Sequence, residues 1–371
     1  MHSNIPLKIG LIGCGRFGQF CLRMYAELQQ VRVVAVADLD DKLVEKVAGE
    51  FGVAAYTDPA RLIQREDVEM VHVATPPFLH FSLGLQAARG RKHVLCEKPL
   101  CLTLDQADEM LACARQQNLI MPVDFVLRYL PIVSLVERVI QSKILGAPLH
   151  AYFENYATDE HLGENHWFWD KRKSGGIFVE HGVHFFDLYR YWFGEAVVLS
   201  AHSEVRPGTE QEDRVTCLLR HASGVVANHY HGFDQPACLD RATHRILFET
   251  GDVTVNGWIP ESCTIHALID ERQATKLQAL CPEARLAVLE TLMKSDLPLR
   301  GRGKAIKATK RIALRYQAPV DKGTLYARGV SDLVLDQVAY IRDRAHERIV
   351  AEENGRQALA LALQASQLAS A

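Results

Sequence analysis

Residues 7–20 read LKIGLIGCGRFGQF, and this stretch decides the fold that we expect for the N-terminal part of the chain. A short apolar run leads directly into the pattern G-x-G-x-x-G, formed by Gly13, Gly15 and Gly18, and a helix-like segment follows at once. The first glycine permits a tight turn, the second lets the backbone approach a pyrophosphate, and the third allows the helix to pack closely on the strand. Because the helix N-terminus then faces the anion, the stretch predicts a dinucleotide-binding turn.

The next apolar run, VRVVAVAD at 31–38, ends in an acid that bears on the identity of the dinucleotide. Asp38 follows Gly18 by twenty residues, a spacing at which an acid accepts hydrogen bonds from the hydroxyls of the adenosine ribose. A carboxylate there also repels a 2′-phosphate, so the sequence favours NAD over NADP. Arg16 and Phe17, inside the glycine pattern, are expected beside the bound cofactor.

Apolar runs alternate with helix-like segments throughout residues 1–125. Unbroken runs rich in β-branched residues, separated by helices, predict a parallel sheet that is covered on both faces. We therefore expect an α/β domain with a doubly wound parallel sheet. The later apolar runs are 68–75, 91–99 and 119–125, and the helix-like segments are 17–29, 41–51, 79–89 and 104–117.

The pattern changes after a further helix-like segment at 131–143. Closely spaced segments of alternating apolar and polar residues, joined by short turns, predict a large open sheet that is mixed or antiparallel. Residues 126–371 are therefore expected to form an α+β domain, and its closing helices at 328–346 and 354–370 could pack back on the first domain. The strand-like segments are 149–157, 197–206, 213–221, 224–232, 243–249 and 262–268.

Composition limits the partners and the compartment. The net charge of −3 and the pI near 6.6 give no basic surplus of the kind that nucleic-acid binders carry. Nine cysteines without a CxxC pair suit reduced thiols in the cytoplasm better than a disulfide framework. Residues 1–8 lack the features of a signal peptide, and no apolar stretch approaches the roughly 20 residues that span a bilayer. We expect a cytoplasmic protein that binds neither nucleic acid nor membrane.

Two short motifs stand where strands of the predicted sheet should end. ATPPFLH (74–80) closes one apolar run, and CEKPL (96–100) closes the next. Open α/β sheets bind ligands in the crevice at the carboxyl ends of their strands. The residues expected along this crevice are Thr75, Pro76 and His80 for the dinucleotide, and Glu97 and Lys98 for its nicotinamide end.

The stretch SGGIFVEHGVHFFD (174–187) sets titratable groups among apolar residues. If it is helical from about Ile177, Glu180, His184 and Asp187 share one face. A polar stripe is costly to bury unless partners or a ligand satisfy it. One interpretation is a catalytic face opposite Lys98. The alternative is a metal site with ligands Glu180 and His184 and either His166 or His181.

These motifs, together with FVLRYLP (125–131) and the two closing helices, resemble the Gfo/Idh/MocA family of oxidoreductases, which includes inositol dehydrogenases and glucose–fructose oxidoreductase. The resemblance covers nearly the whole chain apart from about 270–325. It implies a Rossmann domain followed by a large open sheet whose outer face pairs subunits into homodimers or homotetramers. It also implies hydride exchange between a nicotinamide and the carbinol of a sugar, cyclitol or related polyol.

The resemblance also implies roles for individual residues. The family lysine of EKP matches Lys98, which as a cation can stabilise alkoxide character in the transition state. The histidine of the second motif matches His184, which can accept a proton near neutral pH. Arg128 and Trp167 are expected on the substrate side, and Asp187 is expected to be structural.

Two residues depart from the family pattern. The family generally carries Asp four residues before the histidine, where this chain has Glu180. The catalytic carboxylate then reaches one methylene further, and a misplacement of about 1 Å matters in a positioned site. Asp124 stands where the family tends to be small, and we expect it to face solvent.

Residues 300–315 contain seven basic residues and no acid. The simplest expectation is a solvated helix face on an insertion, because charge runs are commonly exposed. A phosphate-bearing ligand and an acidic patch on a neighbouring subunit are the functional alternatives.

Three functions therefore fit the sequence. The first is an NAD-dependent dehydrogenase for a sugar-like alcohol. The second is an enzyme that retains NAD and uses transient oxidation for elimination or glycoside cleavage, with Glu180 as an extra acid or base. The third is a non-catalytic NAD-bound sensor that acts through protein contacts. Net formation of NADH separates the first from the second.

Overall fold

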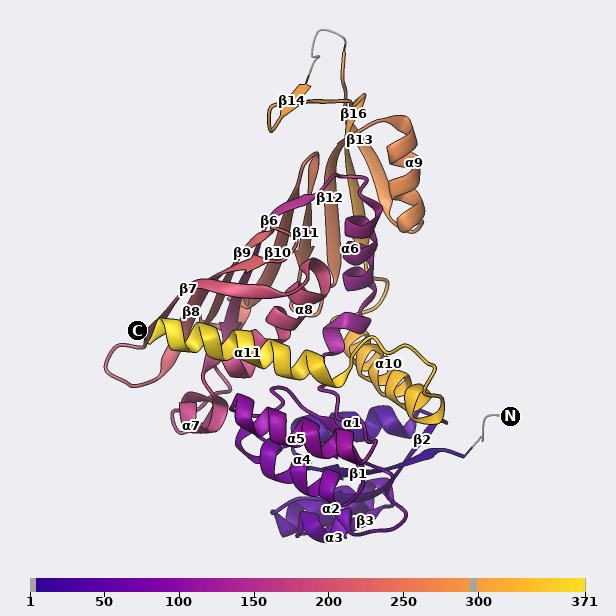
Figure 1. Ribbon diagram of the computed structural model, residues 1–371, viewed down its shortest axis with the longest axis vertical. Helices are drawn as coiled ribbons and strands as arrows, with labels where there is room; N and C mark the ends of the chain where they lie inside the picture. The colour runs from indigo at the N-terminus through magenta and orange to yellow at the C-terminus, as the bar shows by residue number, and fades with distance from the viewer. Residues whose placement is uncertain (1–4, 294–298, 371) are drawn as a thin grey trace. The chain divides into compact units, whose positions relative to one another are not determined.

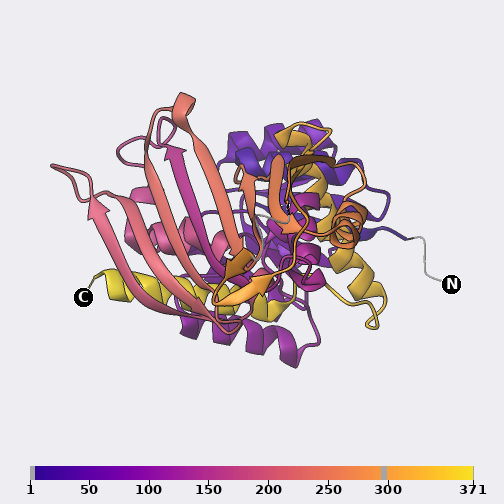
Figure 2. The ribbon, with the colours of Figure 1, turned by 90° about the horizontal axis from the view of Figure 1, so that it is seen from above.

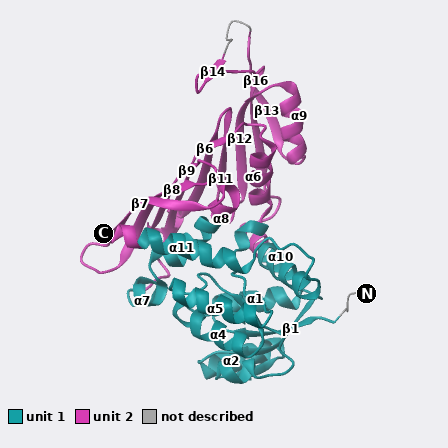
Figure 3. Cartoon of the chain, viewed as in Figure 1, with its two compact units in different colours: residues 1–129, 164–187, 327–366 teal, residues 130–163, 188–326, 367–371 magenta. Residues whose placement is uncertain are grey.

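The computed structural model describes residues 5–293 and 299–370, and the chain divides into two compact units (Figure 3). Unit 1 comprises residues 1–129, 164–187 and 327–366. Unit 2 comprises residues 130–163, 188–326 and 367–371. The domain boundary expected at residue 125 stays a prediction. Residues 1–4, part of the segment considered for a signal peptide, lie outside the described residues.

Unit 1 contains a five-stranded sheet in the order β3-β2-β1-β4-β5, and every neighbouring pair is parallel. The strands are the apolar runs of the sequence, and β1 and β4 are almost wholly buried. This confirms the predicted doubly wound parallel sheet. The strands are β1 (Leu7–Ile12), β2 (Val31–Ala37), β3 (Ala54–Tyr56), β4 (Met70–Val73) and β5 (His93–Cys96).

Helices alternate with these strands along the chain (Figure 1). Several begin at a capping side chain: Asp40 accepts a hydrogen bond from the backbone N of Leu43 at 3.0 Å, and Thr103 accepts one from Gln106 at 3.2 Å. Such caps fix where a turn ends and a helix begins. The alternating helices are α1 (Arg16–Ala26), α2 (Asp41–Phe51), α3 (Pro59–Ile63), α4 (His80–Arg89) and α5 (Leu104–Gln116), and α10 (Lys322–Arg342) and α11 (Glu352–Ala369) follow at the end of the chain.

The strand predicted at 119–125 is wrong. The segment runs beside β5, with backbone hydrogen bonds from Val94 to Ile120 (2.9 Å) and from Cys96 to Pro122 (3.1 Å). Within the described residues it forms an isolated bridge through Val123 and no regular strand. Pro122 has no N–H to donate, which interrupts a ladder at this position.

Unit 2 contains a nine-stranded sheet in the order β13-β16-β12-β11-β10-β6-β9-β8-β7 (Figure 2). Its pairs are antiparallel except β6 with β9, so the predicted mixed sheet is confirmed. Alternate residues of β6 are buried, as expected for a sheet with one covered face. The strands are β6 (Pro148–Thr158), β7 (Ala196–Val205), β8 (Glu212–His221), β9 (Val226–Gln235), β10 (Arg241–Phe248), β11 (Gly251–Asn256), β12 (Ser262–Ile269), β13 (Arg285–Thr291) and β16 (Lys310–Gln317), and the helices α6 (Pro131–Ser142) and α9 (Glu271–Leu280) also belong to this unit.

The helix expected in the basic segment 300–315 is wrong as well. The segment forms the hairpin strands β14 (Leu299–Gly301) and β15 (Lys304–Ile306) and then enters β16. Ile312 and Leu314 of β16 are buried between β12 and β13. The long apolar side chains therefore direct this stretch into the sheet. Its basic residues occupy exposed positions except Lys310, whose side chain is 14% exposed.

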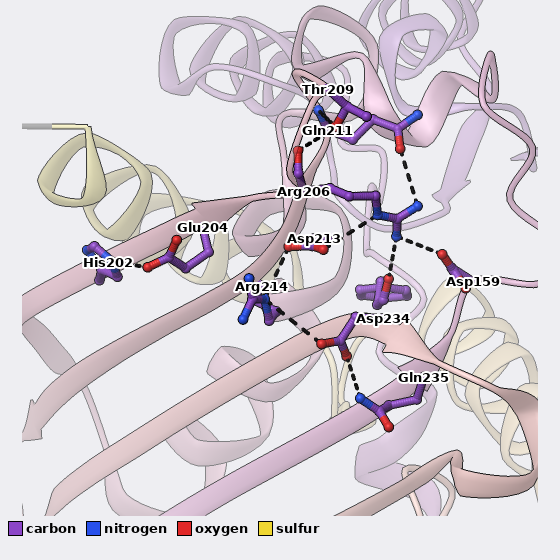
Figure 4. A network of polar contacts seen from close by, with 11 residues as sticks. Asp159, His202, Glu204, Arg206, Thr209, Gln211, Asp213, Arg214, Asp234 and Gln235 are labelled. Carbon is purple, nitrogen blue, oxygen red and sulfur yellow. Dashed lines mark hydrogen bonds and ion pairs between the residues drawn. The ribbon is translucent and has the colours of Figure 1, made fainter.

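A network of polar side chains holds the loops at one end of this sheet (Figure 4). Arg206, which follows β7, donates to Asp159 at 2.6 Å and to the carbonyl oxygen of Phe233 at 3.0 Å, and it lies 3.5 Å from Asp213. The Arg206 side chain is 30% exposed, so solvent screens these ion pairs. Their main effect is to fix the loop conformations.

Three buried histidines lie in the core of unit 2. The rings of His229, His231 and His244 pack around Phe153, with ring centroids 6.0, 5.2 and 4.5 Å from it. All three are fully buried. Burial lowers the pKa of His231 and of His244 to about 3 and that of His229 well below its usual value. The folded core therefore holds these rings neutral.

Acid is expected to destabilise unit 2 through these histidines. An unfolded chain binds more protons than the folded one below about pH 6.5, so the free energy of unfolding is lost as the pH falls from 6.5 toward 3. His244→Phe is expected to reduce this dependence by about 1 kcal/mol per pH unit near pH 5, measured by urea unfolding across a pH series. His202→Phe, at a side chain that is 66% exposed, is the matched control and should leave the slope unchanged. An equal pH dependence of the free energy of unfolding in His244→Phe and the wild type would contradict the conclusion that the fold holds His244 neutral.

Candidate active site

The glycine turn lies between β1 and α1. Gly13 has a φ of +104°, and a Cβ there would lie 2.4 Å from the carbonyl oxygen of Ala74. A Cβ on Gly18 would lie 1.9 Å from the carbonyl oxygen of Gly13. The close packing of strand, turn and helix therefore excludes a side chain at both positions.

Gly15 differs, because a Cβ there would meet nothing within 4 Å. It precedes α1, and among the described residues no side chain caps the first N–H groups of this helix. Open space in front of uncapped N–H groups fits a phosphate of a dinucleotide. Arg16 is exposed at the first position of α1, and Phe17 is half-buried and stacks on Phe20 at 6.0 Å.

Asp38 is fixed at the end of β2 by two backbone groups. Its Oδ2 accepts a hydrogen bond from Cys14 N at 2.7 Å, and its Oδ1 accepts one from Asp40 N at 3.0 Å. The side chain remains partly exposed, and each carboxylate oxygen can accept a further bond. The acid is thus tied to the glycine turn and oriented for the hydroxyls of a ribose.

The ATPP segment supplies a polar atom that the protein does not satisfy. Thr75 Oγ1 is buried and has no hydrogen-bond partner within residues 5–293 and 299–370. Beside it, Pro76 is half-buried and leads into a short 3₁₀ turn. A buried hydroxyl without a partner costs free energy unless a ligand completes it, so this position fits the expected cofactor.

His80 lies behind this segment at the start of α4, fully buried. Its two ring nitrogens lie 2.7 Å from the carbonyl oxygens of Thr75 and Pro99. Burial lowers the pKa of His80, although the two carbonyls act in the opposite direction. Both nitrogens are therefore engaged with backbone, and the ring links the ATPP and EKP segments.

Lys98 meets the second motif directly. Its Nζ donates a hydrogen bond to the backbone carbonyl of Glu180 at 2.9 Å and forms a short ion pair with the Glu180 carboxylate. The two side chains are 18% and 13% exposed. Glu180 lies in a single π-helical turn, Phe178–Gly182, that leads into α8 (Val183–Phe193). The EKP segment and the motif 174–187 thus form one site within unit 1.

His184 stands in the first turn of α8 beside this ion pair. Its side chain is 9% exposed, and its Nδ1 is buried without a hydrogen-bond partner in the described part of the chain. Burial, and then the positive charge of Lys98, lowers the pKa of His184 well below its usual value. A neutral imidazole is the form that can accept a proton at neutral pH.

Arg128 and Asp187 form a buried bidentate ion pair. Arg128 Nε and Nη2 donate to the Asp187 carboxylate at 2.7 and 2.6 Å, and Nη1 donates to the carbonyl oxygen of Ile349 at 3.1 Å. The two side chains are 7% and 1% exposed. This geometry positions α8 and leaves the guanidinium engaged with protein groups. Trp167 is half-buried and lies 5.1 Å from the ring of His166.

Asp124 does not face solvent as expected, because it is 2% exposed. Burial, and then the charge of the neighbouring Glu97, raises the pKa of Asp124 well above its usual value. Glu97 Oε1 lies 3.2 Å from His72 Nε2. His72 Nδ1 in turn lies 2.8 Å from the hydroxyl of Tyr25. Sequence reasoning missed this chain of buried polar groups beside Lys98. The acid directly before FVLRYLP was its one visible signal.

The metal alternative finds no support in the geometry. In residues 5–293 and 299–370, no group of three or more His, Cys, Asp or Glu side chains is arranged to hold a metal ion. The Glu180 carboxylate is engaged by Lys98.

Comparison with protein families identifies the chain. Residues 7–125 match the family described as "Oxidoreductase family, NAD-binding Rossmann fold", and residues 133–253 match the "GFO/IDH/MocA C-terminal domain". The chain belongs to the Gfo/Idh/MocA family. Membership confirms the resemblance drawn from the motifs and the Rossmann assignment of the parallel sheet, and NAD is the cofactor of this family's Rossmann fold.

Two curated relatives illustrate the range of the family. The chain is 29% identical over 228 residues to D-apiose dehydrogenase of Paraburkholderia graminis, a match that covers 59% of each chain. It is 30% identical over 184 residues to 2,7-anhydro-N-acetylneuraminate hydratase of Mediterraneibacter gnavus, covering 50% of this chain and 48% of the relative. The chain therefore matches about half to three fifths of the length of these relatives.

Solved structures share the whole fold. A levoglucosan dehydrogenase in complex with NADH and levoglucosan superposes with a TM-score of 0.79 at 20% sequence identity, over 99% of this chain and 98% of the other. At this level of identity the likeness concerns the fold. Both units of this Gfo/Idh/MocA protein therefore have counterparts in known structures.

Asp38→Asn is expected to weaken binding of NAD by about 10- to 100-fold, because a charge-assisted contact to the ribose is lost. Discrimination against NADP should shrink, since the neutral side chain no longer repels a 2′-phosphate. Titration of the protein with each cofactor, followed by quenching of tryptophan fluorescence, measures both effects. Asp40→Asn is the matched control, because Asp40 caps α2 and asparagine caps a helix equally well, so it should leave both the stability and the NAD affinity unaltered. Equal NAD affinity in Asp38→Asn and the wild type would contradict the assignment.

Proposed function

We propose that this protein is an NAD-dependent oxidoreductase that acts on the carbinol of a sugar, cyclitol or related polyol. One observation carries the proposal: a lysine paired with Glu180 stands beside a buried histidine whose pKa its charge lowers. The site lies at the carboxyl end of β5, where an open α/β sheet binds its ligands. The glycine turn, Asp38 and Thr75 offer a fitting cradle for NAD.

The residues divide the chemistry of alcohol oxidation between them. When bound, NAD supplies the acceptor for the hydride that leaves the carbinol carbon. His184, neutral at physiological pH, accepts the proton of the hydroxyl group. Lys98 stabilises the negative charge that develops on the oxygen as that proton leaves. In the reverse direction His184 returns the proton to the carbonyl oxygen.

The remaining motif residues position these two groups. Glu180 holds the ammonium of Lys98 through its carbonyl and its carboxylate, so a substrate hydroxyl can enter as a further acceptor. Arg128 and Asp187 fix α8, and with it His184. We assign Trp167 to the wall that contacts the sugar ring, and His80 to the support of the cofactor loops.

A second function has a specific observation in its favour. The relative in Mediterraneibacter gnavus is named a hydratase, and Glu180 provides a carboxylate at the site in addition to Lys98 and His184. In an enzyme of that kind, transient oxidation acidifies a neighbouring C–H bond, and the hydride is returned after elimination. Formation of product without accumulation of NADH would identify this alternative.

The proposed function extends to the oligomeric state and the cellular compartment of the protein. We propose a homodimer or homotetramer formed through the large sheet of unit 2. We place the protein in a reducing compartment such as the cytoplasm, because all nine cysteines are free and eight are buried or half-buried. None of the described helices is long and apolar enough to cross a membrane.

A sensor without catalysis is disfavoured by the pairing of Lys98 with Glu180 beside His184.

Lys98→Ala is expected to lower kcat on the active substrate by 10²- to 10⁴-fold, because alkoxide stabilisation and substrate orientation are lost together. The substrate is found by mixing the protein and NAD with a panel of sugars and polyols and recording absorbance of NADH. Lys46→Ala, on an exposed turn of α2, is the matched control and should retain full activity. The assignment fails if no compound reduces the cofactor, or if Lys98→Ala turns over as fast as the wild type.

A further inference from the structure

A cavity of about 230 Å³ lies near the amino end of β5. Its wall is formed by the last turns of α5, the segment 118–120, the end of α10 and the residues up to the start of α11, all of them in unit 1. Ile120, in this wall, donates from its backbone N to His93 Nδ1 at 3.2 Å and accepts a hydrogen bond from Val94 N at 2.9 Å. Lys98 follows the other end of β5. The cavity is therefore separate from the proposed active site.

The lining of the cavity combines apolar and charged side chains. Leu111, Ala114 and Ile120 contribute buried apolar surface. The charged side chains are those of three arginines and two glutamates, namely Arg115, Arg344, Arg348, Glu352 and Glu353. At neutral pH this set carries one net positive charge. A ligand that satisfies both parts of the lining has one negative charge and an apolar body.

Two of the arginines are paired with the glutamates of the lining. The Arg348 side chain is 7% exposed and donates to both carboxylate oxygens of Glu352, each at 2.7 Å. This pair is a fixed part of the wall, because a bidentate contact with little exposure holds both side chains in place. Arg115 donates to Glu353 at 3.1 Å, and these side chains are 73% and 52% exposed. Solvent screens this second pair, so Arg115 can turn toward a ligand at little cost.

Arg344 carries the charge that no carboxylate of the protein neutralises. Its Nη2 donates to the carbonyl oxygen of Asn118 at 2.9 Å, and it forms no ion pair in the described part of the chain. Its guanidinium carbon lies 4.7 Å from the centre of the Tyr340 ring, which orients the group. Burial, and then the charges of Arg344 and Arg342, lowers the pKa of His93 to about 4. A carboxylate suits this guanidinium, because its two oxygens match two parallel N–H groups.

We propose that this cavity is a second ligand site, which binds a small monocarboxylate with an apolar body. Arg344 holds the carboxylate, and the apolar body packs against Leu111, Ala114 and Ile120. Sites for drug-sized ligands measure roughly 300–1,000 Å³, so a cavity of about 230 Å³ takes a smaller molecule. Inorganic phosphate fits less well, because it brings more than one negative charge and no apolar surface. The proposal does not depend on the proposed function.

Ligand-observed NMR with benzoate, on the whole protein without NAD, tests the chemistry of the ligand. The wild type should bind benzoate with a Kd on the order of 1 mM, as expected for a molecule of this size. Benzamide has the same shape without the charge and should bind at least about tenfold more weakly, because a charge-assisted contact is lost. Acetate, which lacks the ring, and inorganic phosphate should also bind more weakly than benzoate.

Three variants locate the bound benzoate. Arg344→Gln should weaken its binding by at least about tenfold, and folding should be preserved because Arg344 is exposed. Arg89→Gln is the matched control: Arg89 belongs to the same unit, is 66% exposed and lies outside the lining, so its loss removes the same charge and should leave the affinity unchanged. Lys98→Met should also bind benzoate like the wild type, because the cavity is separate from the proposed active site.

Several outcomes would overturn the proposal. Absence of benzoate binding up to about 10 mM would refute the site, and so would an unchanged affinity in Arg344→Gln. Equal affinities for benzoate and benzamide would show that the charge takes no part. Phosphate or acetate binding as tightly as benzoate would show that the apolar lining takes no part. Loss of binding in Lys98→Met would place benzoate in the proposed active site instead of the cavity.

Discussion

The contact between Lys98 and Glu180 is the constraint on which the site depends. It joins a residue that follows a strand of the parallel sheet to a residue 82 positions later, in the turn that starts α8. An ion pair with little exposure is costly unless both partners are well satisfied, and here the lysine also bonds the Glu180 carbonyl. The π-helical turn and the Arg128–Asp187 pair keep α8 in register for this contact. The longer Glu180 side chain thus meets Lys98 directly.

The site separates the protonation states of its members by their surroundings. His184 is kept neutral by burial and by a neighbouring cation, so it suits proton acceptance. Burial raises the pKa of Glu97 to about 7, and burial together with the charge of Glu97 raises the pKa of Asp124 well above its usual value. Groups whose pKa values are pushed apart in this way can take different roles at one pH. The differences among the pKa values of these three side chains follow mainly from their burial.

Short sequence patterns were sufficient to predict the glycine turn that binds the cofactor. They were insufficient to predict which polar side chains are buried beside Lys98. Gly13, Gly18 and Asp38 act through neighbours in the β1–α1–β2 unit, so spacing alone predicts them. The parallel sheet and the mixed sheet likewise follow from periodicity. Asp124 is buried beside the end of β5, where its backbone N donates to the carbonyl oxygen of Cys96, and no local pattern predicts this tertiary contact. In 300–315 the charges suggested a helix, whereas pairing with β12 and β13 decided the structure.

The most direct measurement of the central claim is the protonation of His184 followed by ¹⁵N NMR of its imidazole across a pH series. The account predicts that the ring stays neutral at pH values well below 6.5 in the wild type. In Lys98→Met the pKa of His184 should rise and still remain below its ordinary value, because burial acts alone. A His184 that titrates near pH 6.5 in both proteins would contradict the account, since neither burial nor Lys98 would then control the proposed base.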